Sequence, residues 1–163
     1  MSSMKDELTQ LFSDHAKRTQ LMHTLLSCAD YALEHQEDIT RSYKSDGTVL
    51  TRTDMHIHHQ VTETLRRLYP GCGIISEESD YTYPAGSIGW FVLDPIDGTD
   101  AYSQGMPSWC IALGILDQQF QPVGGIVIAP RWGIGSSGSL ILQRFPGEQP
   151  MIGEVPIVQK QFT

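Results

Sequence analysis

The sequence has no CxxC pair, and its three cysteines, Cys28, Cys72 and Cys110, lie far apart. An odd number of widely spaced cysteines is typical of a reducing compartment, so we expect a cytoplasmic protein without a zinc site. No apolar run approaches the roughly 20 residues that cross a membrane. Residues 1–14 are too polar for a signal peptide. Internal repeats and low-complexity tracts are absent as well.

Basic residues are also scarce, because 11 Lys and Arg stand against 19 Asp and Glu, for a net charge of -8. A general nucleic-acid binder needs a basic face, so this balance argues against that class. The length of 163 residues fits one domain with its own core, and a hydrophobic content of 40% is ordinary for a globular protein. We therefore expect a single domain over residues 1–163, with neither nucleic acid nor a membrane as partner.

Two segments have the apolar periodicity of helices. Between residues 4 and 37, apolar residues recur at three- and four-residue steps without Pro or Gly, which fits one long helix or two consecutive ones. A second amphipathic helix is expected from Thr53 and Asp54 to a stop at residues 69–71. Asp54 lies near the start of this helix, where it is either a cap or a functional acid, and the pattern leaves both open.

Three histidines, His56, His58 and His59, fall in the first turns of this second helix. Clustered histidines can bind a metal ion, but no acid or cysteine occurs here at a matching spacing. We therefore predict that all three are solvated surface residues.

Short runs rich in β-forming residues occupy most of the remaining chain. The expected strands are residues 49–51, 73–76, 90–93, 108–116, 123–129 and 139–142, with a hairpin turn at 117–122. Because helices come first and the later strands are joined by short turns, we predict an α+β fold. It would be a two-layer sandwich with two long helices packed on one face of a largely antiparallel sheet. Residues 145–163 contain three prolines and are expected to be irregular.

The run of residues 89–100 carries the strongest functional pattern. An apolar strand ends at Asp94, and the proline after it gives a rigid exit. Asp97 follows three residues later, and two carboxylates on one stiff loop repel unless a cation such as Mg²⁺ lies between them. Gly98 allows a positive φ, and Thr99 is a residue type that starts helices, whose amides bind anions. The run predicts chemistry on a phosphate, although each Asp-Pro or Asp-Gly pair alone is also a common turn former.

A second strand ends in acids at Glu77 and Glu78. Adjacent glutamates usually face water in a solvated loop, which is the simpler interpretation. The pattern of a strand that delivers an acid nevertheless occurs twice, at Glu77 and at Asp94. Two such strand ends could converge on one metal ion.

Three separate motifs resemble the inositol monophosphatase family of Mg²⁺-dependent phosphomonoesterases. Residues 94–99, Asp-Pro-Ile-Asp-Gly-Thr, match the signature of that family. Residues 44–54 are similar to its lysine-to-aspartate segment, and residues 74–79 to its Gly-Glu-Glu-Ser strand end, with Ser76 where glycine is usual. Residues 107–116 resemble the strand after the signature. The motifs occur in the expected order and cover residues 1–130.

The resemblance implies a set of Mg²⁺ ligands. Glu77, Asp94 and the backbone carbonyl of Ile96 would hold one Mg²⁺. Asp94 would bridge to a second Mg²⁺ that Asp97 also holds. The substrate would be a small phosphorylated metabolite, such as an inositol, sugar, nucleotide or histidinol phosphate.

The resemblance also implies the catalytic groups. Asp54 and Thr99 would orient and deprotonate the attacking water, and Glu77 would serve catalysis through the metal. The amides of Gly98 and Thr99 would bind the substrate phosphate at a helix start. The fold implied is the N-terminal, metal-binding half of the sugar-phosphatase fold.

The sequence departs from the family pattern in one respect. Family members continue into a second domain with a Trp-Asp motif whose aspartate completes the second metal site. Here Trp90, Trp109 and Trp132 precede Phe, Cys and Gly, so we expect that this C-terminal domain is absent. The alternative to an active phosphatase is therefore a truncated, non-catalytic or partner-dependent module. An apolar face left open in this way also predicts a homodimer.

Overall fold

The computed structural model describes residues 4–79, 84–133 and 138–157. Its helices are α1 (Met4–Leu11), α2 (His15–His35), α3 (Arg52–Leu68) and the short α4 (Thr99–Ser103). Within these described residues, no helix has the length and apolar character needed to cross a membrane.

The first helical segment is two helices, which decides between the two alternatives that the periodicity left open. α1 ends at Leu11, and Asp14 begins α2 as its N-cap. The Asp14 carboxylate accepts hydrogen bonds from the amides of Ala16 and Lys17. The cap satisfies amides at the start of α2 that have no partner within the helix. The interruption between α1 and α2 therefore costs little stability.

The strands form a two-stranded and a seven-stranded sheet. The small sheet pairs β1 (Arg41–Tyr43) with β2 (Val49–Thr51). The large sheet runs in chain order through β3 (Gly73–Ser76), β4 (Trp90–Asp97), β5 (Cys110–Leu116), β6 (Pro122–Ala129), β7 (Leu140–Arg144), β8 (Met151–Ile152) and β9 (Val155–Pro156). Only β3 and β4 are parallel among these pairs, and the others are antiparallel.

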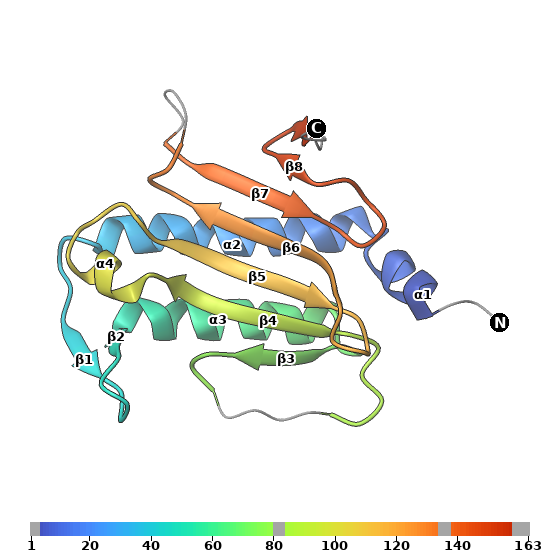
Figure 1. Cartoon of the computed structure of the whole chain (residues 1–163), viewed down its shortest axis with the longest axis horizontal. Coiled ribbons are helices and arrows are strands. Elements are labelled where there is room, and N and C mark those ends of the chain that lie inside the picture. The colour runs from blue at the N-terminus through green and yellow to red at the C-terminus, as the bar shows by residue number, and fades with distance from the viewer. Residues whose placement is uncertain (1–3, 80–83, 134–137, 158–163) are drawn as a thin grey trace, which may run out of the picture.

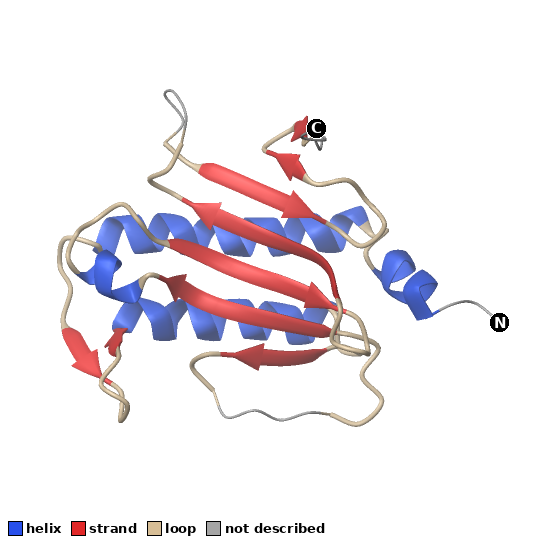
Figure 2. Ribbon diagram, viewed as in Figure 1, coloured by secondary structure: helices blue, strands red, loops and turns tan. Residues whose placement is uncertain are grey.

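The large sheet and two long helices make the two layers that the sequence predicted. α2 and α3 lie side by side on one face of the sheet (Figure 1), and none of the described helices covers the other face (Figure 2). The core between the layers includes Leu21, Leu25, Ile57, Val61, Leu65, Phe91, Leu93, Ile111, Leu113, Ile126 and Ile128. Burial of each such side chain contributes roughly 1.5–3 kcal/mol. The α+β sandwich is confirmed.

Two predicted boundaries differ in the structure. The strand expected to stop at Asp94 continues to Asp97, because a bulge between these two residues accommodates a proline that cannot donate to the ladder. The prediction of an irregular stretch from residue 145 is confirmed for residues 145–150 but wrong for residues 151–156, because β8 and β9 form a hairpin there that extends the sheet beyond β7. Residues 158–163 lie outside the described residues.

Candidate metal and phosphate site

The parallel pairing of β3 with β4 brings two of the predicted acids together. Ser76 is in register with Leu93, and the amide of Glu77 donates to the Leu93 carbonyl at 3.2 Å. Glu77 and Asp94 are the next residues along the two strands. The two acids are therefore neighbours at the point where β3 ends, as the sequence predicted for acids that converge.

Asp94 lies in a site where negative charge is not fully neutralised by a neighbouring positive group of the described residues. Its Oδ1 atom is buried and has no hydrogen-bond partner within the described part of the chain. Burial raises the pKa of Asp94 to about 7, and the charges of Glu77 and Asp97 add to the shift. A carboxyl with an unsatisfied buried oxygen beside two further carboxylates favours a bound cation.

Lys44 supplies the positive charge that the structure does hold here. Its Nζ atom donates to Glu77 Oε1 at 2.8 Å and to Glu78 Oε1 at 2.7 Å. Burial disfavours the charge of Lys44, but the hydrogen bonds to the two glutamates outweigh it and raise the pKa of the ammonium. The segment between β1 and β2 is thereby tied to the end of β3. The sequence motif included Lys44 but did not predict its contact with Glu77 and Glu78.

Asp54 and Thr99 meet as the resemblance implied. Asp54 is 1% exposed, and Thr99 Oγ1 lies 3.0 Å from Asp54 Oδ1 and 2.9 Å from the Ile96 carbonyl. The hydroxyl has one proton and can donate to either oxygen. Burial raises the pKa of Asp54, while hydrogen bonds from Thr51 and Thr99 oppose the shift.

Asp54 is also a helix cap, which confirms one of the two interpretations that the sequence left open for this residue. Its Oδ2 atom accepts from the amide and hydroxyl of Thr51, and the Thr51 hydroxyl accepts from the Asp54 amide. This reciprocal capping box fixes the start of α3. One carboxylate oxygen therefore holds the helix, and the other faces Thr99.

Gly98 connects β4 to α4 in a conformation that side chains disfavour. Its φ is +94°, and a Cβ atom added there would lie 2.7 Å from the Ser108 carbonyl. A residue with a Cβ would have to displace backbone as well as adopt a left-handed φ. The turn presents the amides of Gly98 and Thr99 at the first turn of α4, where a phosphate was predicted.

The donor set fits a hard cation in its chemistry. Glu77, Asp94, Asp97 and the Ile96 carbonyl offer only oxygen atoms, which Mg²⁺ prefers. Across residues 4–79, 84–133 and 138–157, no group of three or more His, Cys, Asp or Glu side chains is arranged so as to hold a metal ion. The Glu77 carboxylate is bound to Lys44 instead. The unpartnered oxygen of Asp94 is the feature that speaks for a cation.

One histidine lies at this site against the sequence prediction. His58 was expected on the surface, but it is 7% exposed and its Nδ1 atom lies 2.7 Å from Ser76 Oγ. Burial lowers the pKa of His58, so the ring is neutral at neutral pH. The prediction was wrong because the helical period puts His58 on the same face as Asp54 and Ile57, which packs on the sheet. The helical period was therefore the sequence signal that could have predicted the burial of His58.

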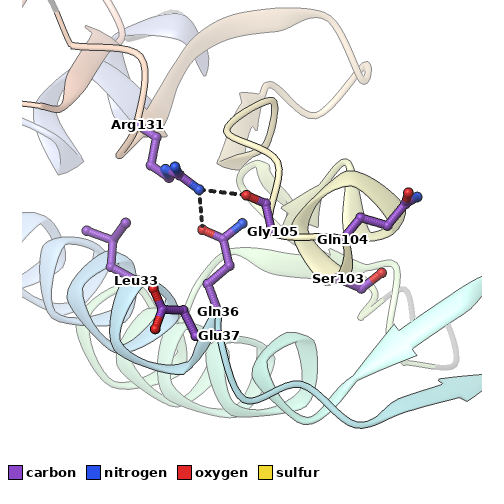
Figure 3. Close-up of a pocket in the computed structure, with 7 residues that line it drawn as sticks. All are labelled: Leu33, Gln36, Glu37, Ser103, Gln104, Gly105 and Arg131. Atoms are coloured by element: carbon purple, nitrogen blue, oxygen red, sulfur yellow. Dashed lines mark hydrogen bonds between the residues drawn. The ribbon is translucent and has the colours of Figure 1, made fainter.

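Two cavities lie near these elements. A polar cavity of about 630 Å³ is lined by Gln36, Glu37, Gln104 and Arg131, and it contains none of the predicted site residues (Figure 3). Arg131 spans it by donating to Gln36 Oε1 and to a backbone carbonyl.

An apolar groove of about 390 Å³ adjoins the carboxylates instead. It begins at Asp97 and Gly98 and continues over the sheet face that the described helices leave open, along Trp109, Cys110, Val127, Ala129, Trp132, Leu140 and Leu142. Cross-strand register places Asp94, Ala112, Val127 and Leu142 in one row on this face. The acids and the open apolar face are therefore continuous.

Comparisons with known proteins show which sequences and folds this chain resembles. Residues 9–150 match the profile of the inositol monophosphatase family. A 3'(2'),5'-bisphosphate nucleotidase CysQ of Aggregatibacter actinomycetemcomitans is 28% identical over 123 residues, which are 71% of this chain and 45% of that protein. A histidinol-phosphatase of Mycobacterium tuberculosis is 34% identical over 99 residues, 58% of this chain and 37% of that protein.

A solved structure has the same fold. The extragenic suppressor protein suhB of Bartonella henselae superposes with a TM-score of 0.73 at 17% identity, over 86% of this chain and 53% of that one. The chain thus spans about half the length of the proteins that it matches.

Proposed function

Because the chain belongs to the inositol monophosphatase family, we propose that it forms the metal- and phosphate-binding part of a Mg²⁺-dependent phosphomonoesterase. The observation that supports this most is the buried, unpartnered oxygen of Asp94, which stands beside the charges of Glu77 and Asp97. The family is generally metal-dependent, and relatives of this chain bear the names of phosphatases.

Glu77, Asp94, Asp97 and the carbonyl of Ile96 would hold the magnesium. When bound, Mg²⁺ lowers the pKa of water and neutralises charge on the phosphate. A bulge in β4 separates the two acids of that strand, and the charge of Asp97 still acts on Asp94. Fixed ligands suit phosphoryl transfer, because that chemistry depends mostly on positioning and electrostatics.

Asp54 and Thr99 would handle the proton of the attacking water. Thr99 Oγ1 already lies within hydrogen-bond distance of Asp54 Oδ1. The Thr99 hydroxyl would take a proton from the water as it gives its own proton to Asp54, whose raised pKa suits a base that accepts it. The amides of Gly98 and Thr99 would bind the phosphate oxygens.

The substrate would be a small phosphate monoester. Relatives are named for different substrates, a bisphosphate nucleotide and histidinol phosphate. The features common to such substrates are a phosphate group and a polar leaving group. The three free thiols further support a proposed cytoplasmic location.

A phosphate-release panel tests the proposal. The chain is incubated with inositol, sugar, nucleotide and histidinol phosphates, with Mg²⁺ and with EDTA. We expect release that EDTA abolishes, and we expect the variant Asp94→Asn to lose most Mg²⁺ binding and nearly all turnover. Mg²⁺-dependent turnover by Asp94→Asn would contradict the bridging role of this residue.

The second candidate function is a module that acts only with a partner. The open apolar groove beside Asp97 and Gly98 favours it, because monomeric proteins rarely expose extended apolar surface. This candidate predicts no phosphate release by the chain alone under any condition of the panel. A longer gene product or an added partner would then restore it.

A further inference from the structure

Two buried polar residues on α3 reach two different strand ends. Asp54 and His58 are four residues apart, so they lie on the same face of the helix. Asp54 bonds Thr99, which follows β4, and His58 bonds Ser76, the last residue of β3. One helix face is thus fastened to both of the strands that deliver predicted metal ligands.

The contact of His58 with Ser76 lies immediately beside Glu77. Ser76 is fully buried, and Figure 1 places β3 and α3 next to one another. Side chains alternate along a strand, so Ser76 faces α3 while Glu77 leaves toward the carboxylate cluster. The Glu77 side chain is 48% exposed. Lys44 holds its carboxylate, so its position depends on this ion pair and on the backbone that carries it more than on packing.

We propose that His58 is a positioning residue, which through Ser76 Oγ holds the end of β3 so that Glu77 stands beside Asp94. The hydrogen bond fixes the last residue of β3 against α3, immediately before Glu77. Groups that orient metal ligands influence metal affinity in this way. The inference rests on the proposed function, since it assigns His58 to the same Mg²⁺ site.

The measurement is Mg²⁺ affinity by calorimetry on the whole chain, with thermal unfolding recorded for each variant. His58→Ala should weaken Mg²⁺ binding by about tenfold to a hundredfold. Ser76→Gly should have a similar effect, and the double variant should bind no more weakly than the weaker single variant, because both substitutions remove one bond. His58→Asn keeps a polar atom near the place of Nδ1 and should restore most of the affinity.

His23→Ala is the matched control, since His23 is an exposed histidine on α2. It should leave Mg²⁺ affinity unchanged. If His58→Ala does not fold, Ser76→Gly carries the test, because it removes only the hydroxymethyl group.

A purely structural bond gives a different result. In that case His58→Ala and Ser76→Gly lower the unfolding temperature but bind Mg²⁺ as the parent chain does, and the positioning role is overturned. Failure of His58→Asn to restore affinity also overturns it. If the parent chain itself binds no Mg²⁺, the proposed function fails, and this inference fails with it. The titration of the parent chain distinguishes this outcome from a failure of the positioning role alone.

Discussion

The hydroxyl of Thr99 stands between two oxygens with different roles. One belongs to the buried carboxylate of Asp54, and the other is the carbonyl of Ile96, a proposed metal ligand. A hydroxyl in this position can carry a proton from water toward Asp54 without contacting the metal. Its contribution should therefore be to turnover and not to metal binding.

Thr99→Ala should lower kcat by about a hundredfold or more, the usual contribution of a positioned proton-transfer group. Mg²⁺ affinity should stay nearly constant, because the Ile96 carbonyl and the acids remain. Steady-state kinetics and a calorimetric titration measure the two quantities. Thr99→Ser keeps the hydroxyl and is the control. A large loss of Mg²⁺ affinity in Thr99→Ala would count against this assignment.

At the scale of elements, the ends of β3 and β4 bring like charges together. Parallel register sets Glu77 beside Asp94, and the bulge keeps Asp97 nearby. Without a bound metal ion, the carboxylates at these strand ends repel one another, and this repulsion lowers the free energy of unfolding. The repulsion gives the metal-free chain a characteristic dependence on pH.

The contribution of Asp94 to the stability of the metal-free chain should be lost as pH rises from about 4 to about 7, while the lowered pKa values of His56 and His58 act in the opposite direction. The pKa of Asp94 is about 7 in the folded chain against an ordinary value of 3.8, so the folded state keeps a proton that the unfolded state releases. The same direction holds for Asp54 and Glu78, whose pKa values burial also raises. Allowing for solvent screening, we expect a loss of roughly 1–2 kcal/mol from Asp94.

Urea unfolding in EDTA across this pH range measures the effect. Asp94→Asn should flatten the curve and should stabilise the metal-free chain at pH 8, although it abolishes metal binding. Asp30→Asn, at an exposed position on α2, is the control and should leave the slope unchanged. An Asp94→Asn variant whose stability depends on pH in the same way as that of the parent chain would contradict the assignment of charge at these strand ends.

At the scale of the whole molecule, the sheet is covered on one face and open on the other. α2 and α3 bury the inner face, while the outer face carries the apolar groove and Trp132, which is 53% exposed. The predicted homodimer remains a prediction, and this face is where we expect the contact.

Sedimentation velocity over a wide concentration range should show self-association of the chain. Replacing the exposed indole by Trp132→Ser should weaken it, because apolar area buried between copies drives association. Phe120→Ser, an exposed aromatic outside the groove, is the control. A monomer at high concentration in the parent chain would remove the expectation.

The sequence alone determined most of the elements of this protein and its family resemblance. Apolar periodicity is local, so it predicted the helices and most of the strands, and the Asp-Pro-Ile-Asp-Gly-Thr run specified an oxygen-rich donor set in one continuous segment. It missed β1, β8 and β9, because strands of two or three residues are too short to show a periodicity. It also placed the end of β4 too early, since a bulge that admits proline depends on the neighbouring strand.

Tertiary structure decided which of these residues meet. The burial of His58 against Ser76, the engagement of Glu77 by Lys44 and the contact of Thr99 with Asp54 join positions 18, 33 and 45 residues apart. No local pattern encodes such contacts, because they depend on strand register and on which helix face packs on the sheet. The raised pKa of Asp94 follows for the same reason, since burial and neighbouring charge exist only once the chain is folded.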